Sequence, residues 1–212
     1  MIDEGVIKYS CEWVLGEKVD LELIQSLIRW RNYIHQLGLI GVYDNGIGFG
    51  NISIRISDTL QFIISGSQTG HLAQLEAEHF TVVTDFNIEQ NHLTCCGPIQ
   101  ASSESLTHAA IYSIQPQINA IIHVHHPQLW QHLLYQIPTT RQQVKYGTPA
   151  MAAEMFRLFA EENLSQQKIL VMAGHEDGLL TFGKDLNEAG EILMQYYNFS
   201  IGSSILKTSD ED

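Results

Sequence analysis

The sequence predicts a mixed α/β domain, and three observations support this prediction. Segments in which apolar residues recur with helical spacing alternate along the chain with short apolar or alternating runs typical of strands. No segment repeats at a fixed period, and no linker rich in proline or glycine marks a domain boundary. The chain has 212 residues, of which 44% are hydrophobic, so it can bury a substantial core without disulfides or a structural metal. We therefore expect a single domain over residues 1–212.

The N-terminal part of the chain predicts one helix followed by a strand hairpin. Apolar residues recur with helical spacing over residues 21–38, and Gly38 supplies a stop. Residues 41–50 contain four glycines and predict a loop that leads into residues 51–56, where apolar and polar residues alternate. Residues 60–64 complete the expected hairpin, and the polar loop that follows is suited to holding an anion.

The remainder of the chain predicts further strands and helices. Residues 80–86 form an apolar run before an expected loop that ends at Gly97-Pro98. We expect a helix to begin near Ser103, and residues 118–125 predict a buried strand because they are too apolar and too short for an exposed helix. The last predicted elements are helices over residues 150–161 and 186–199 and strands over residues 169–172 and 179–182.

The charge balance restricts the classes of partner. The chain has 11 Lys and Arg residues against 24 Asp and Glu residues, which gives a formal net charge of −13. Nucleic-acid backbones and anionic lipid surfaces attract basic clusters, and the sequence has none. We therefore expect a small-molecule substrate, no nucleic-acid partner and no membrane partner.

The cysteines and the N-terminal residues bear on localisation. Cys11, Cys95 and Cys96 are odd in number and two of them are adjacent, which speaks against a disulfide framework. The N-terminal residues lack a basic segment followed by an apolar run, and no stretch of about 18 apolar residues is present. We expect a cytoplasmic protein.

The sharpest local motif is His123-Val124-His125 at the end of the predicted buried strand. Side chains at positions i and i+2 of a strand point to the same face, so the two imidazoles converge. Such a pair is a start for a zinc site, and the alternative is two hydrogen-bonded histidines beside a loop. His126 should face away from the pair.

A third imidazole is available at His175, in a turn between two predicted strands. It is a candidate third ligand, and the alternative is a solvent-exposed turn residue. The other histidines are expected to lie on the surface or to have packing roles, and these are His35, His71, His79, His92, His108 and His132.

Glu104 follows two serines at a predicted helix start, where the helix dipole favours a carboxylate. One interpretation is therefore simple stabilisation of the helix end. The other interpretation is that Glu104 acts as a proton-transferring base beside a divalent metal.

Five motifs follow one another along the chain, namely Gly50-Asn51-Ile52-Ser53-Ile54-Arg55, Ser65-Gly66, Ser102-Ser103-Glu104, His123-Val124-His125 and His175. In this order they resemble the class II aldolase/adducin family over nearly the whole chain. The resemblance implies a three-layer α/β/α sandwich around a mainly antiparallel, mixed central sheet. It also implies a homotetramer with sites near the subunit interfaces.

The resemblance also implies the roles of the site residues. Zinc or another divalent metal would be bound by His123, His125 and His175, with Glu104 as acid and base. Hydroxyls, an amide side chain and backbone N–H groups can bind a phosphate without a lysine, although ordinary turn chemistry also explains such residues. The positions that match phosphate-binding positions of the family are Asn51, Ser65, Gly66, Ser102 and Ser103.

Three departures from the family pattern concern the site. Ile63-Ile64 replaces the usual Thr-Pro, so the anion loop lacks one hydroxyl and one rigid turn. The interval from His175 to Gly178 is two residues longer than usual, so the ligand could shift or the loop could bring a carboxylate into the site. No tyrosine follows Pro138 at the expected point, and Tyr146 nearby is either a substitute or, as we expect, a packing residue.

The main hypothesis is a metal-dependent lyase that cleaves a small hydroxy-carbonyl compound, a sugar phosphate in the first instance, by a retro-aldol reaction through a metal-stabilised enediolate. Dehydration, decarboxylation or epimerisation of a related sugar phosphate could use the same enediolate. A different class of function is a non-catalytic interaction domain like the adducin head.

Overall fold

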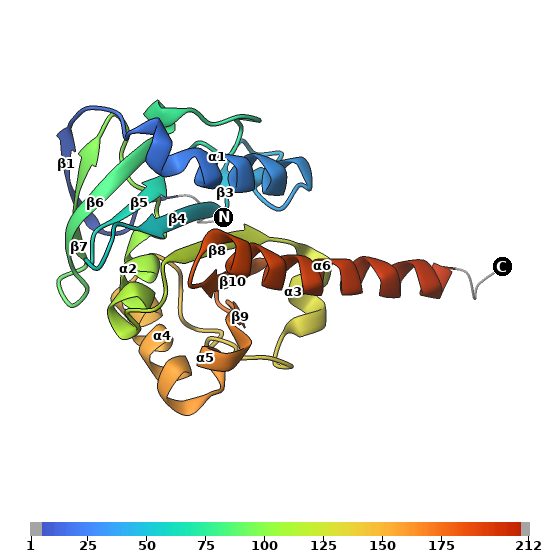
Figure 1. Cartoon of the computed structure of the whole chain (residues 1–212). Helices are drawn as coiled ribbons and strands as arrows, with labels where there is room; N and C mark the ends of the chain where they lie inside the picture. The colour runs from blue at the N-terminus through green and yellow to red at the C-terminus, as the bar shows by residue number, and fades with distance from the viewer. Residues whose placement is uncertain (1–5, 209–212) are drawn as a thin grey trace.

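An eight-stranded sheet forms the centre of the structure, a computed structural model that describes residues 6–208 (Figure 1). All neighbouring strands are antiparallel except the edge pair β1 and β7, which is parallel. The prediction of a mainly antiparallel, mixed sheet is therefore confirmed. The strands, in spatial order, are β1 (Ser10–Leu15), β7 (His92–Gly97), β6 (Phe80–Asn87), β5 (Phe62–Ser65), β4 (Asn51–Arg55), β8 (Ala120–His125), β10 (Gly178–Gly183) and β9 (Ile169–Val171).

Helices cover both faces of this sheet, which gives the predicted three layers. One apolar core joins the first face to α2, α4 and α5, and a second joins the opposite face to α1, α3 and α6. On β8, Ile121 belongs to the first core and Ile122 to the second, because successive strand residues point to opposite faces. The helices are α1 (Leu21–Gln36), α2 (Ser105–Ile114), α3 (Pro127–Leu133), α4 (Pro149–Glu161), α5 (Leu164–Gln167) and α6 (Leu186–Thr208).

Strand β8 explains why an apolar run ends in two histidines. All six of its residues are buried, because β4 and β10 pair with it on either side and helices cover both of its faces. The pairing places Asn51 of β4 opposite His123, and Gly178 of β10 opposite His125. An interior strand of the sheet therefore carries two of the candidate ligands.

The predicted hairpin, buried strand and helices are confirmed, but the segment before Gly97 was wrongly expected to be a loop. It forms β7, in which Leu93 and Cys95 are buried while the alternate residues His92, Thr94 and Cys96 are only partly buried. The polar residues of this segment obscure the alternation of buried and partly buried positions in the sequence. Sequence patterns also did not predict β1, the short hairpin of β2 (Gly41–Val42) and β3 (Gly48–Phe49), α3, α5, or the 3₁₀ turn η1 (Ala77–His79).

Helix α6 is the longest helix and extends past the end of the sheet (Figure 1). Among the described residues, no helix has both the length and the apolar composition that crossing a membrane requires.

Helix α1 allows a matched test of the core. Leu27 has no exposed surface, whereas Leu23 on the same helix is 59% exposed. We expect Leu27→Ala to lower the free energy of unfolding by about 2–5 kcal/mol, because it removes buried methyl groups and leaves a cavity. Leu23→Ala should change it by less than about 0.5 kcal/mol. Urea unfolding followed by circular dichroism measures both, and equal losses would contradict the assignment of the α1 core face.

Candidate active site

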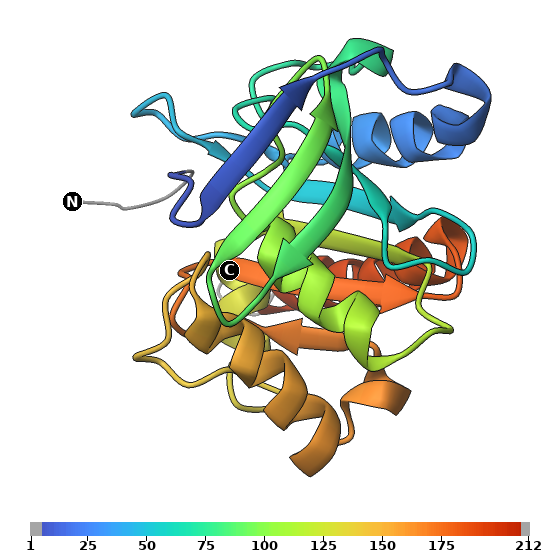
Figure 2. The ribbon, with the colours of Figure 1, turned by 90° about the vertical axis from the view of Figure 1, so that its left-hand side faces the viewer.

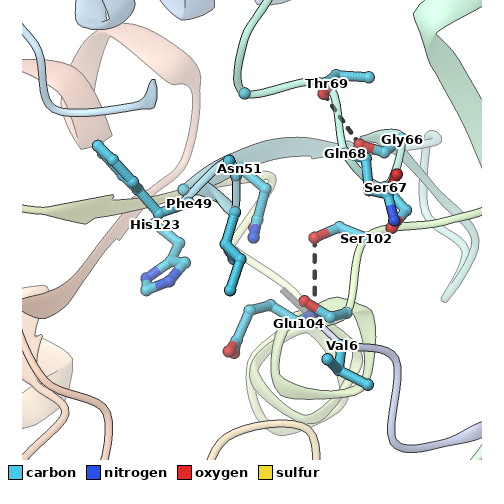
Figure 3. A pocket seen from close by; sticks show the side chains of 16 residues that line it. Val6, Phe49, Asn51, Gly66, Ser67, Gln68, Thr69, Ser102, Glu104 and His123 are labelled. Atoms are coloured by element: carbon cyan, nitrogen blue, oxygen red, sulfur yellow. Dashed lines mark hydrogen bonds between the residues drawn. The ribbon is translucent and has the colours of Figure 1, made fainter. Parts of the chain in front are cut away.

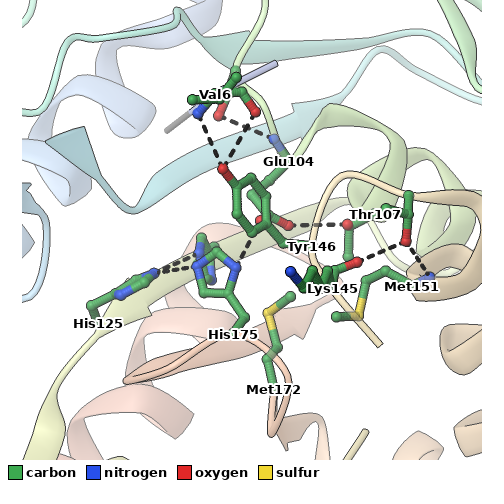
Figure 4. A network of polar contacts seen from close by, with 12 residues as sticks. Val6, Glu104, Thr107, His125, Lys145, Tyr146, Met151, Met172 and His175 are labelled. Carbon is green, nitrogen blue, oxygen red and sulfur yellow. Dashed lines mark hydrogen bonds and ion pairs between the residues drawn. The ribbon is translucent and has the colours of Figure 1, made fainter. Parts of the chain in front are cut away.

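Three imidazoles meet at the C-terminal end of β8, an interior strand of the sheet. His123 and His125 project from β8. His175 comes from the turn between β9 and β10, and Figure 4 shows its ring facing that of His125. The Nε2 atom of His125 lies 3.1 Å from Nε2 of His123 and 2.8 Å from Nε2 of His175. Three ring nitrogens from two distant segments are therefore directed at one point.

The other ring nitrogens have partners that orient the histidines. Nδ1 of His123 donates to the carbonyl oxygen of Leu179 at 2.9 Å, so the proton of the neutral ring sits on Nδ1 and the Nε2 lone pair faces the cluster. Nδ1 of His125 lies 2.7 Å from Oη of Tyr43. This hydrogen bond fixes the plane of the second ring.

Burial keeps two of these rings uncharged. The pKa values of His123 and His125 lie well below the ordinary histidine value because the rings are removed from water, and the neighbouring His175 lowers them further. Neutral imidazole is the form that binds a metal.

The turn that carries His175 is shaped by close packing. A Cβ atom at Gly178 would lie 2.7 Å from Cδ2 of His175 and 3.3 Å from Cε1 of His123, so only glycine leaves room for the rings. Glu176 is exposed, and neither it nor Asp177 belongs to the cluster. The longer interval between His175 and Gly178 thus brings no extra carboxylate into it.

The donor set fits a divalent metal. In a tetrahedral site with zinc–nitrogen bonds of about 2.0–2.1 Å, ligand nitrogens lie about 3.4 Å apart. The observed separations of 2.8 and 3.1 Å need only small shifts to reach that value. Three imidazole ligands leave a fourth position for water or substrate, as in catalytic zinc sites.

Glu104 lies beside the cluster, in the turn that begins α2. Its Oε1 atom is 3.3 Å from Nδ1 of His175, and its Oε2 atom accepts a hydrogen bond from the hydroxyl of Thr107 (Figure 4). The residue is only 2% exposed, and its side chain makes no capping hydrogen bond to α2. Helix capping therefore does not explain this carboxylate. Helix α2 begins at Ser105, two residues after the expected start near Ser103.

A cavity of about 220 Å³ opens next to these groups (Figure 3). His123 and Glu104 line it, so a bound molecule would reach both the imidazole cluster and the carboxylate. Its remaining lining residues are Val6, residues 46–51, residues 66–70, Ser102 and Ser103.

Three of the predicted anion ligands face this cavity. Asn51, Ser102 and Ser103 line it and are almost completely buried. The Oδ1 atom of Asn51 has no hydrogen-bond partner among the residues that the structure describes. A hydroxyl or N–H group of a ligand in the cavity can donate a hydrogen bond to this oxygen.

The other two predicted anion ligands make hydrogen bonds within the fold. The hydroxyl of Ser65 accepts a hydrogen bond from the backbone N–H of Ile52 at 3.2 Å, and Ser65 does not line the cavity. Gly66 lines it, but its N–H donates to the carbonyl oxygen of His79. These two residues shape the wall between β4 and β5.

The polar loop after Gly66 supplies lining residues that the sequence analysis did not single out, namely Ser67, Gln68, Thr69 and Gly70. The buried guanidinium of Arg31 donates to the carbonyl oxygens of Thr69 and Leu72 and so fixes the loop from behind. Burial lowers the pKa of Arg31 to about 10, so its charge persists at neutral pH. The loop is therefore hydrogen-bonded to a fixed positive charge.

Tyr146 packs beside the imidazole cluster. Its ring lies 4.5 Å from that of His175, between centroids, and its hydroxyl accepts a hydrogen bond from the backbone N–H of Val6 at 3.1 Å. Lys8 places its ammonium 3.6 Å above the same ring. An N-terminal segment thus closes one side of the site, and no local motif marked it.

The other histidines whose contacts the structure shows have structural roles. His108 is completely buried and bonds to the hydroxyl of Ser53. His126 lies outside the cluster and caps α3, where its Nδ1 accepts from the N–H of Leu129. Tyr43 was missed because only the folded hairpin of β2 and β3 brings it to His125.

Solved structures of other proteins share this fold at low sequence identity. An L-fuculose 1-phosphate aldolase superposes with a TM-score of 0.66 at 17% identity, over 92% of this chain and 90% of that one. The L-fuculose-1-phosphate aldolase from Thermus thermophilus gives 0.64 at 18% identity, over 90% and 97% of the two chains. YgbL from Escherichia coli, a candidate aldolase, epimerase or decarboxylase, gives 0.64 at 18% identity, over 87% and 89%.

The sequence itself places the chain in a family. None of the curated proteins shows a significant match. Residues 42–198, well over half of the chain, match the family model of the class II aldolase and adducin N-terminal domain. The chain is therefore a member of the class II aldolase and adducin family.

Proposed function

We propose that this protein is a divalent-metal-dependent lyase that cleaves a small hydroxy-carbonyl compound, with sugar phosphates as the substrate class. The observation that carries the proposal is the convergence of three Nε2 atoms beside Glu104 at the wall of one cavity. Membership of the family and the likeness to L-fuculose 1-phosphate aldolases support a retro-aldol reaction.

His123, His125 and His175 would hold the metal, with zinc as the first candidate. When bound, the cation would stabilise the negative charge that develops on the carbonyl oxygen of the substrate as the carbon–carbon bond breaks. The buried, neutral state of His123 and His125 makes their lone pairs available without loss of a proton at neutral pH.

Glu104 would transfer the proton. Its carboxylate takes the proton from the hydroxyl of the carbon that becomes the aldehyde, and the electron pair of the breaking carbon–carbon bond moves toward the carbonyl group. The protonated Glu104 then returns this proton to the carbon that lost its partner. The contact with His175 and the hydrogen bond from Thr107 hold the carboxylate in place for both transfers.

Asn51, Ser102 and Ser103 would bind the phosphate group of the substrate from the lining of the cavity. The first turn of α2 follows these serines, so its dipole favours an anion there. The charge of Arg31 behind the loop of residues 66–70 adds a positive potential in a protein with a net charge of −13. Ser65 and Gly66 contribute by holding the wall in place.

Epimerisation, decarboxylation or dehydration of a related sugar phosphate is the second candidate, favoured by the likeness to YgbL. Product analysis by NMR separates these reactions from net cleavage. An adducin-like interaction domain is disfavoured, because it would not need three converging imidazoles next to a buried carboxylate.

Tyr43 provides a test of the metal centre that does not depend on activity. Its hydroxyl orients His125, and loss of such a supporting hydrogen bond weakens metal binding by about 10–100-fold. We expect Tyr43→Phe to lower zinc affinity to this extent in a competition titration with a chromophoric chelator. Tyr135→Phe is the control, since Tyr135 is 62% exposed. Equal zinc affinities of the two variants would contradict this role of Tyr43.

Glu104 provides the test of the reaction. We expect the zinc-loaded protein to cleave at least one member of a panel of ketose and aldose phosphates, assayed beside their unphosphorylated forms. Glu104→Gln should lower kcat by about 10²–10⁴-fold, because the amide accepts no proton, while zinc remains bound. Glu176→Gln, at an exposed neighbour of His175, should keep the wild-type rate. Unchanged turnover in Glu104→Gln, or a panel without any conversion, would overturn the proposal.

A further inference from the structure

Two cysteine thiols face each other on neighbouring strands, away from the histidine cluster. Cys11 lies on β1 and Cys95 on β7, and their Sγ atoms are 3.7 Å apart. Figure 2 shows these strands side by side, with β1 at the outer edge of the sheet. Cys96 points to the opposite face of β7, where its Sγ atom packs beside Gly16. Only one of two adjacent cysteines is therefore placed to react with Cys11.

We propose that Cys11 and Cys95 form a redox-active dithiol, which low-molecular-weight disulfides of the glutathione class oxidise to an intramolecular disulfide. The thiolate of Cys11 attacks one sulfur of the oxidant, forms a mixed disulfide and releases one thiolate of the oxidant. The sulfur of Cys95 then attacks Cys11, passes its proton to solvent and releases the second thiolate. Two protein thiols are oxidised, and one disulfide is reduced to two thiols.

The surroundings of the pair assign these two roles. Cys11 is partly exposed, and the hydrogen bond between the two thiols lowers its pKa, so Cys11 is the first to ionise. The same contact, together with burial, raises the pKa of Cys95, which has no exposed surface. An oxidant from solution therefore meets Cys11 first, and Cys95 resolves the mixed disulfide from within the fold.

The strand geometry allows the sulfurs to close the remaining distance. Cys11 pairs directly with Leu93, so it meets Cys95 on the diagonal, and a bond of about 2.05 Å requires the two strands to shift. Strand β1 can shift because it lies at the sheet edge and is paired only with β7. A bond formed with such strain is more readily reduced, which suits a reversible site.

The disulfide would fasten a segment that belongs to the wall of the cavity. Just before Cys11, the hydroxyl of Tyr9 donates to the carbonyl oxygens of Ala101 and Ser102, and Val6 lines the cavity. Oxidation would thus tie this N-terminal segment covalently to β7. It needs neither the metal nor a sugar substrate, so it stands independently of the proposed function.

The test is oxidation of the full chain, with and without zinc, in buffers of increasing oxidised to reduced glutathione ratio. After alkylation of free thiols, mass spectrometry of the digest should show a peptide pair joined through residues 11 and 95, which dithiothreitol separates. The oxidised protein should also melt at a higher temperature than the reduced one, because the bond restricts the unfolded chain.

Three matched variants test which cysteines form the disulfide. Cys96→Ser should form the same link, whereas Cys11→Ser should form none and show no shift in melting temperature on oxidation. In Cys95→Ser, the reaction should stop at the mixed disulfide, with one glutathione attached to Cys11. A link through Cys96, a disulfide between two chains, or alkylation of both Cys11 and Cys95 at every glutathione ratio would overturn the proposal.

Discussion

The antiparallel pairing of β8 with β10 is the constraint on which the site depends. It sets His123 opposite Leu180 and His125 opposite Gly178, and the turn before β10 brings His175 back over the end of β8. The same pairing supplies the carbonyl oxygen of Leu179 that accepts the Nδ1 proton of His123. Two backbone strands thus determine the position and the tautomer of a ligand.

The neighbouring elements complete the site from both sides of this pair. Strand β4 places Asn51 beside His123, and the turn into α2 places Glu104 beside His175. These side chains lie on the face of the sheet that packs against the first apolar core, where a buried polar group is stable only if its hydrogen bonds are met. The bonds from Tyr43 to His125 and from Thr107 to Glu104 serve this need and at the same time fix geometry. Stability and preorganisation therefore come from the same contacts.

Much of this arrangement was predictable from local sequence rules. The period of a strand predicted that His123 and His125 share a face, and the apolar run before them predicted a buried strand; both predictions are confirmed. The helix over residues 21–38 and the hairpin after it were predicted for the same reason, since hydrophobic spacing reflects burial. The family resemblance contributed the three layers, which hydrophobic spacing alone does not specify.

The remaining features depend on contacts between distant segments, which no local pattern reports. Tyr43 and Val6 reach the site only because a hairpin and an N-terminal segment fold back over it. Ser65 fits an anion-binding motif, yet its hydroxyl bonds to the backbone of Ile52 in the adjacent strand. Strand β7 was missed because its polar residues interrupt the apolar pattern. The fold accepts them there because one face of this strand is only partly buried.

The central claim is that one divalent cation binds to three imidazoles from two distant segments. Anomalous diffraction at the zinc absorption edge, from crystals of the zinc-loaded protein, tests it most directly. The expected result is a single strong peak about 2.0–2.1 Å from the Nε2 atoms of His123, His125 and His175. A peak at other side chains, or the absence of any peak in this cluster, would contradict it.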